Sequence, residues 1–249
     1  MQRTDTLTCG YKIIQNDSAF CFGIDAVLLS AFTRMKKGNC VYDLGCGNGI
    51  LELLLSARAR ELKCAHGAGE CRFTGLEVQP AAVEMARESV RLNGLEGQVQ
   101  IVEGNICAVK ELFPAQCADV VVSNPPYMVP AAAKANSTDE KTIARHEVLC
   151  SLDDVVGAAK WLLKSNGSFF MIHRPYRLQK IFSSLEKYHL TPRRMQLVYP
   201  KVTLPPEMVL IEARPNYKPD LKIEPALIMY GSDGEYTSEF KAYCGGFLN

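Results

Sequence analysis

The chain is predicted to be an α/β protein with a mostly parallel sheet and helices on both faces, and three observations lead to this prediction. Short apolar stretches alternate along the sequence with segments of helical periodicity. A glycine-rich stretch at residues 45–49 joins an apolar run to a helical one. The 249 residues are 47% hydrophobic and show no repeat or linker. We therefore expect one domain over residues 1–249, with a small N-terminal segment (1–38) packed on it.

Seven apolar runs are predicted as strands, and most segments between them as helices. Asn-Gly pairs at residues 93–94 and 166–167 should end two helices, and Pro175 should lie in the first turn of a third. A small hairpin is expected between residues 11–15 and 20–22. The predicted strands are residues 40–44, 72–77, 99–103, 118–123, 168–173, 195–199 and 208–213. The predicted helices are residues 80–93, 153–164 and 175–187, with another that begins at residue 50.

The glycine-rich loop is the first candidate binding site. It follows a predicted strand, opens a helix and has Asp43 two residues before its first glycine. Glycines allow the backbone to turn sharply and a ligand to approach closely. A dinucleotide site would favour the spacing G-x-G-x-x-G and a pyrophosphate, whereas an acid here suits a ligand with an ammonium group. Glu77, at the end of the next strand, is placed to hold ribose hydroxyls.

The second candidate site is Asn124-Pro125-Pro126-Tyr127, directly after the strand predicted at 118–123. Pro125 biases Asn124 toward an extended backbone, so its amide is held at the carboxyl end of a strand, where open α/β sheets bind ligands. The amide and the adjacent carbonyls can accept hydrogen bonds from an amino group, and Tyr127 offers a ring for stacking. A rigid turn without chemistry is the alternative interpretation, because Asn-Pro is common in turns.

These motifs resemble those of a known enzyme family. Residues 43–49 resemble motif I of the S-adenosylmethionine-dependent methyltransferases, and residues 124–127 resemble motif IV of those that methylate amino groups. Residues 22–30 resemble the segment that precedes motif I in that group. The resemblance spans nearly the whole chain and is to the bacterial tRNA(Val) (adenine-N6) methyltransferase family. Further similar stretches are residues 144–147, 172–178, 210–214 and 234–239.

The resemblance implies a Rossmann-like class I methyltransferase with a seven-stranded sheet, and S-adenosyl-L-methionine as cofactor. One departure is Asn105, where the family usually has an acid that meets the adenine amino group; an amide oxygen can still accept that bond. The implied cofactor-binding residues are Gly23, Asp25, Asp43, Leu44, Gly45, Cys46, Gly47, Gly49, Glu77, Val78, Asn105, Ile106 and Asn124. The implied catalytic residues are Asn124, Pro125, Pro126 and Tyr127, and the implied substrate-binding residues are Tyr127, Arg145, Arg174 and Arg177.

The expected reaction is methyl transfer to the exocyclic N6 of an adenine in tRNA, beside the anticodon, and it requires no metal. Asn124 and the Pro125 carbonyl would accept the two N–H bonds of the amine, and His146 is not needed as a base. Ten cysteines are scattered singly, which indicates reduced thiols. Residues 64–71 contain two cysteines and a histidine in none of the usual zinc spacings, so we interpret them as a surface loop with incidental thiols.

The distribution of charge favours an RNA partner. The net charge is only +1, but residues 134–201 hold 12 basic and 6 acidic residues. Arg193, Arg194 and Lys201 could extend this basic surface. The stretch 129–147 has little apolar periodicity and is interpreted as a substrate loop. The alternative interpretation of the charge is an ordinary solvated face.

Three other functions stay open on the sequence alone. A protein glutamine-N5 methyltransferase uses the same Asn-Pro-Pro-Tyr chemistry, although we see no separate N-terminal helical domain of the kind that group carries. A ribosomal-RNA guanine-N2 methyltransferase and a non-catalytic RNA-binding module are the others. No apolar run is long enough for a membrane span, and no signal peptide is visible. We therefore expect a cytoplasmic enzyme, either a monomer or a weak dimer.

Overall fold

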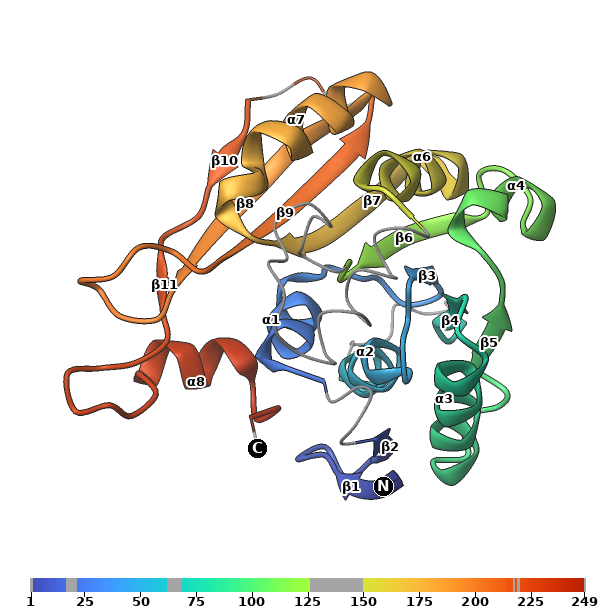
Figure 1. Ribbon diagram of the computed structural model, residues 1–249, viewed down its shortest axis with the longest axis horizontal. Coiled ribbons are helices and arrows are strands. Elements are labelled where there is room, and N and C mark those ends of the chain that lie inside the picture. Colours follow the sequence, from blue (N-terminus) through green and yellow to red (C-terminus); the bar gives the residue numbers. More distant parts are fainter. Residues whose placement is uncertain are drawn as a thin grey trace, which may run out of the picture.

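A computed structural model describes residues 2–16, 22–61, 69–125, 150–216, 218 and 220–248. Its main feature is a twisted sheet with helices on both sides (Figure 1). The strands of this sheet are β3 (Cys40–Leu44), β4 (Arg72–Glu77), β5 (Val99–Glu103), β6 (Ala118–Ser123), β7 (Leu163–His173), β8 (Leu190–Tyr199), β9 (Met208–Pro215), β10 (Lys222–Ile223) and β11 (Leu227–Ile228).

The strand order confirms the predicted mostly parallel sheet. It runs β5-β4-β3-β6-β7-β9-β8, with β9 antiparallel to both of its neighbours. The seven predicted strands are all present. Two additional strands of two residues each, β10 and β11, pair in parallel with β8 and raise the count in this sheet to nine. Such short pairings carry no apolar run of their own, so sequence periodicity does not reveal them.

The helices cover both faces because strand side chains alternate between two cores. Phe170 and Ile172 enter the core that packs against α1, α2, α3 and α8. Phe169 and Met171 enter the core that packs against α4, α6 and α7, on the opposite side of the sheet (Figure 1). The α-helices are α1 (Ile24–Phe32), α2 (Ile50–Arg60), α3 (Pro80–Leu92), α4 (Val109–Leu112), α6 (Leu152–Leu162), α7 (Leu178–Lys187) and α8 (Ser238–Cys244).

Short 3-10 turns precede two of these helices. They are η1 (Ile106–Ala108) and η3 (Pro175–Arg177). The predicted helix at 175–187 is thus η3 followed by α7, with the proline in its first turn as expected. Among the described residues, no helix combines the length and apolar character that a membrane crossing requires.

The boundary between α6 and β7 differs from the prediction. Asn166-Gly167 was expected to end the helix, but α6 ends at Leu162 and β7 begins at the next residue. Leu163 pairs with Ala118 at the start of β6, and a register shift follows before Ser168 pairs with Val120. Pairing with β6 therefore outweighs the local helix-stop signal.

An N-terminal hairpin is present, but one of its two strands is not the one that was predicted. β2 (Lys12–Asn16) pairs with β1 (Gln2–Thr6), whereas Phe22 lies outside any strand and residues 17–21 are outside the described residues. A turn closes this hairpin through Leu7 N to Tyr11 O at 2.7 Å. The hairpin docks on α3, where Ile14 N donates to Ser89 Oγ at 2.9 Å.

Candidate functional site

The site lies at the carboxyl ends of four adjacent strands, β6, β3, β4 and β5. Asp43 on β3 is in register with Val122 on β6 and with Gly75 on β4. Glu77 ends β4 opposite Glu103, the last residue of β5. Parallel pairing therefore brings together side chains that are far apart in the sequence, at the edge where open α/β sheets bind ligands.

The glycine loop has the backbone conformation that its sequence predicted. Gly45, Gly47 and Gly49 all have positive φ angles, of 83°, 55° and 83°. Residues other than glycine rarely adopt such angles. A methyl group added at Gly45 would meet nothing within 4 Å. The loop thus presents bare backbone to an open space, as close approach of a ligand requires.

Glu77 ties this loop to the neighbouring strand. Its Oε2 accepts a hydrogen bond from Gly47 N at 3.0 Å, and its Oε1 accepts from Val78 N at 3.0 Å and Gln79 N at 2.9 Å. The side chain is 5% exposed. Each carboxylate oxygen has further lone-pair capacity, so Glu77 can still accept from a ribose hydroxyl. Val78, also predicted at the cofactor site, is half-buried in the same turn.

Two more acids are buried beneath the loop. Asp43 is 3% exposed and Glu52, in the first turn of α2, is 1% exposed. None of their four carboxylate oxygens has a hydrogen-bond partner within the described structure. Burial and then the charges of Glu52 and Glu77 raise the pKa of Asp43 well above its usual range. Burial likewise raises the pKa of Glu52 from 4.5 to about 8.

Glu52 is a site residue that the sequence interpretation missed. The sequence does carry a signal for it, because Glu52 is a single acid inside the apolar run 50–55. An exposed helix face would carry several polar residues. A side chain at Gly75 would collide with Glu52 and with Cys46 Sγ, the latter at 2.7 Å. Gly75 therefore provides the space in which Glu52 and the loop pack over β4.

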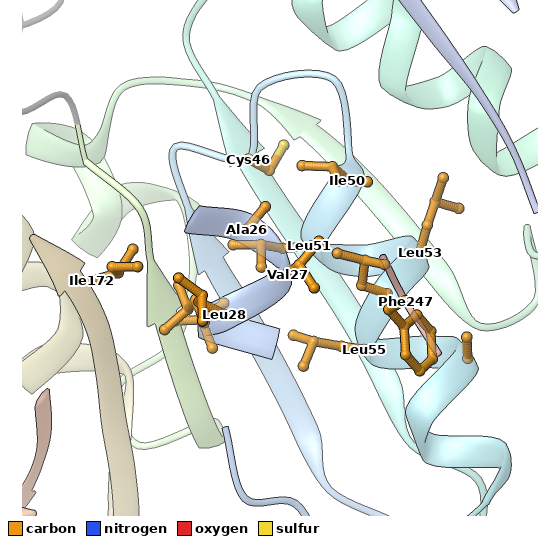
Figure 2. Close-up of a cluster of buried hydrophobic side chains, with 14 of the residues drawn as sticks. Ala26, Val27, Leu28, Cys46, Ile50, Leu51, Leu53, Leu55, Ile172 and Phe247 are labelled. Atoms are coloured by element: carbon orange, nitrogen blue, oxygen red, sulfur yellow. The ribbon is translucent and has the colours of Figure 1, made fainter. Parts of the chain in front are cut away.

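The beginning of α1 lies beside the loop. Ala26 and Val27 pack in the same core as Cys46 and Ile50 (Figure 2). Cys46 is 4% exposed, and burial raises the pKa of its thiol, so it behaves as a small apolar side chain and not as a reactive one.

The remaining predicted residues of this region are placed by α1 and β3. Gly23 is exposed at the N-cap of α1, and Asp25 Oδ1 accepts from Ala26 N at 3.0 Å in the first turn. Leu44 is 1% exposed, so only its backbone can face a ligand. Its carbonyl oxygen accepts from Ser123 Oγ at 2.8 Å.

The end of β5 places Asn105 and Ile106 next to Glu77. Gly104 N donates to Glu77 O at 2.9 Å. Asn105 Oδ1 accepts from Cys107 N at 2.9 Å and caps η1. Asn105 and Ile106 are half-buried, so the amide oxygen retains capacity for a second donor at the rim of the site.

The Asn-Pro run begins where β6 ends. Asn124 is half-buried and Pro125 is buried, one strand away from Asp43. Pro126 and Tyr127 are outside the described residues, as are Arg145, His146 and most of the 64–71 loop. The structure therefore places the first half of this motif beside the glycine loop.

The predicted substrate arginines follow β7, the strand next to β6. Arg174 is half-buried and donates from Nη1 to Glu207 O at 3.2 Å, whereas Arg177 is 8% exposed. Between them Tyr176 is 70% exposed, a ring that the sequence interpretation did not single out. Burial, then Arg177 and Arg174, lower the pKa of His173 to about 4, so the imidazole stays neutral in an electropositive corner.

The expected extension of the basic surface is wrong for Arg194. Its Nε donates to Glu212 Oε2 at 3.0 Å and its guanidinium lies 3.7 Å over the Phe32 ring. The residue as a whole is 8% exposed. Arg193 also binds Glu212, at 2.7 Å, while Lys201 is exposed. Sequence-based charge counting does not distinguish a buried ion pair from a surface cation.

The residues of the loop fit an ammonium-bearing nucleoside ligand such as S-adenosyl-L-methionine. Asp43 offers two buried oxygens without partners, which a cation would satisfy. Gly45 offers open space above the backbone, and Glu77 and Asn105 offer acceptors at the ends of the next two strands. The fit rests on these four positions.

Comparisons with known proteins point the same way. The family model described as "Methyltransferase small domain" matches residues 12–191. The chain is 26% identical over 242 residues to the tRNA1(Val) (adenine(37)-N6)-methyltransferase of Haemophilus influenzae, covering 92% of this chain and 92% of the relative. It is 27% identical over 234 residues to the protein of that name in Proteus mirabilis, covering 90% and 86%.

Solved structures share the fold. A predicted O-methyltransferase from Agrobacterium tumefaciens aligns with a TM-score of 0.70 at 19% identity, covering 90% of this chain and 97% of the other. TrmN from Thermus thermophilus aligns with a TM-score of 0.53 at 15% identity, covering 76% and 48%. The Rossmann-like class I architecture predicted from the motifs is thereby confirmed.

Proposed function

Because the chain belongs to the methyltransferase small domain family, we propose that it transfers a methyl group from S-adenosyl-L-methionine to the exocyclic N6 of an adenine in tRNA. The target is an adenine beside the anticodon of a tRNA(Val)-type substrate, as in the name of the relatives. The observation that carries the proposal is the position of Asn124-Pro125 at the end of β6, one strand from the buried acid Asp43.

The loop residues hold the methyl donor. S-adenosyl-L-methionine supplies a methyl group activated on a sulfonium. Asp43 receives the ammonium group of its amino-acid part, since an unpaired buried carboxylate gains most from a cation. Glu77 receives the ribose hydroxyls, and the Asn105 amide oxygen receives the adenine amino group.

Asn124 activates the acceptor nitrogen. An aromatic amine is a poor nucleophile because its lone pair is delocalised into the ring. The Asn124 amide oxygen and the Pro125 carbonyl accept its two N–H bonds, which favours a more tetrahedral nitrogen and stabilises the positive charge that develops there. Alignment with the donor methyl supplies much of the remaining acceleration, and the proton leaves to water.

The edge next to β7 receives the RNA. Tyr176 exposes its ring at this edge, where unpaired bases can stack. Arg174 and the exposed Lys180 flank it and suit phosphates. Arg177 and His173, both buried, shape this corner from below. Tyr127 and Arg145 complete the substrate contacts expected from the motif.

The remaining properties follow from this activity. The reaction uses no metal, and residues 1–249 act as one catalytic domain with segment 1–38 packed on it, as a monomer or a weak dimer. The location is the cytoplasm, where tRNA is modified.

A methyl-transfer assay tests the proposed substrate. The purified chain is incubated with isotopically labelled donor and with unmodified tRNA, ribosomal RNA or a protein fraction. Label should enter tRNA and be recovered as N6-methyladenosine. Label in protein alone would establish the glutamine-N5 alternative, label in N2-methylguanosine the ribosomal-RNA alternative, and no label in any fraction the non-catalytic binding module.

The Asn124→Ala variant tests the catalytic assignment. Turnover should fall by roughly 100-fold or more, because one acceptor for the developing charge is lost, while donor affinity measured by calorimetry stays largely intact. Near-normal turnover would show that Asn124 is only a turn residue.

A double charge reversal tests the RNA edge. Arg174→Glu with Lys180→Glu should weaken tRNA binding and reduce its salt dependence by a slope of about one per lost contact. The matched control is Arg72→Glu, an exposed residue at the amino end of β4. Equal affinity and salt slope in both variants would show that the edge is an ordinary solvated face.

A further inference from the structure

Three side chains on the outer side of the fold gather at the junction of η1 and α6. Cys107 lies in η1, Cys150 precedes the N-cap of α6, and Asp154 lies in the first turn of α6. Their two sulfurs and a carboxylate oxygen all lie within 4.8 Å of one another. Two thiols and a carboxylate that converge in this way have no role in the methyl transfer described above.

The surrounding structure holds this cluster in place and leaves it accessible. Asp154 Oδ2 accepts from Ser151 N at 2.8 Å and from Ser151 Oγ at 2.7 Å in a capping box, which orients the carboxylate. Cys107 is exposed, and with Asp154 it lines a cavity of about 480 Å³ between α4 and α6. A small solute therefore has an entry path to Cys107 and Asp154.

The donor set matches a thiophilic divalent cation. Zinc is bound tetrahedrally by thiolates at about 2.3 Å and by carboxylate oxygens at about 2.0–2.2 Å, which sets two thiolates about 3.8 Å apart. The observed separations, none above 4.8 Å, need a contraction of about 1 Å at most to reach this geometry. We propose that Cys107, Cys150 and Asp154 bind one Zn²⁺ ion, with water as the fourth ligand.

The chemistry favours a cation over a disulfide between the two cysteines. A disulfide would join only the two sulfurs and would not involve Asp154, whose carboxylate is held beside them by two hydrogen bonds. A divalent cation displaces the thiol protons and neutralises the charge that these groups would otherwise concentrate.

The proposed ion would connect η1 with the start of α6. Cys107 N already holds the Asn105 side chain, and α6 packs against η1 through the core that contains Val109 and Val155. A bound cation would fix η1 against the start of α6. Its role is structural, and it stands or fails independently of the methyl-transfer proposal.

Cadmium titration tests the site, because thiolate-to-cadmium charge transfer gives an ultraviolet band that counts bound thiolates. The full chain is reduced with a phosphine and freed of metal, and zinc uptake is measured in parallel by elemental analysis. The wild type should bind one more equivalent of each ion than Cys107→Ala. The loss of affinity should exceed the roughly 10–100-fold that changes in outer-shell residues cause.

Matched variants separate this site from the other cysteines and acids. Cys117→Ser changes a half-buried cysteine outside the cluster, and Asp153→Asn changes the neighbouring acid, which binds Ser184 and Lys187 instead. Both should retain the extra equivalent, whereas Asp154→Asn should lose it. Equal uptake by wild type and Cys107→Ala would overturn the proposal. The proposal would also be overturned if the reduced chain took up no cation and the oxidised chain contained a Cys107–Cys150 disulfide.

Discussion

Glu212 and Asp43 are buried carboxylates on strands of the same sheet, 1% and 3% exposed, yet their surroundings differ. Glu212 accepts from Arg193 at 2.7 Å and from Arg194 at 3.0 Å, and Ser168 lies 3.5 Å away. Asp43 has no hydrogen-bond partner in the described structure, and its titratable neighbours are the acids Glu52 and Glu77. Burying a charge without a partner is costly. A satisfied acid therefore marks a structural pair, whereas an unsatisfied acid at a strand end marks a place for a cationic ligand.

The largest effect is expected from breaking the satisfied pair. Glu212→Gln should lower the free energy of unfolding by about 3–5 kcal/mol, because the buried Arg194 loses its counter-charge. Urea denaturation followed by circular dichroism measures this loss. A double variant, Glu212→Leu with Arg194→Met, should recover most of it, since an apolar replacement of both partners is often neutral. A small loss in the single variant would remove the contrast with Asp43.

A smaller effect, of a different kind, is expected at the unsatisfied acid. Asp43→Asn should weaken S-adenosyl-L-methionine binding by roughly 100-fold, about 3 kcal/mol, because the ammonium group loses its buried counter-charge. The free energy of unfolding should stay equal or rise. Calorimetry and urea denaturation measure the two quantities. The control is Asp119→Asn, since Asp119 lies at the opposite end of β6 and binds Cys40 N and Lys164. It should reduce stability and leave donor affinity intact.

A third effect is expected from Glu52, as a change in the pH dependence of stability that develops gradually over several pH units. Burial and then the charge of Glu77 raise its pKa from 4.5 to about 8. Between these two values the folded protein holds a proton that the unfolded chain releases, so stability falls as the pH rises from about 4.5 to about 8. The steepest contribution is about 1 kcal/mol per pH unit.

Glu52→Gln should flatten this part of the stability profile without changing the fold. Denaturation at pH 5 and pH 8 measures the difference, and Glu84→Gln, at a side chain that is 70% exposed, serves as the control. Parallel profiles for the wild type and Glu52→Gln would mean that Glu52 is charged in the folded protein. It would then be, like Asp43, a buried carboxylate without a hydrogen-bond partner in the described structure.

Most of the fold and much of the candidate site were predictable because their signals are local. The apolar runs predicted the seven longer strands of the nine-stranded central sheet, and the glycine loop adopted the conformation that its spacing indicated. The acid Asp43 and the amide Asn124 follow strands in the sequence. Parallel pairing then brought their strand ends to one edge, as the α/β pattern implies.

The tertiary structure alone decided which residues far apart in the sequence meet. It paired β2 with β1 at the N-terminus, and it extended β7 across a local helix-stop signal. It placed Arg194 in a buried pair with Glu212, Glu52 beneath the loop, and Cys107 beside Cys150. Periodicity and motif spacing act over a few residues, so they determine elements and strand ends. Whether a charge is exposed, paired or buried depends on what the rest of the chain packs against it, and only the folded structure specifies that.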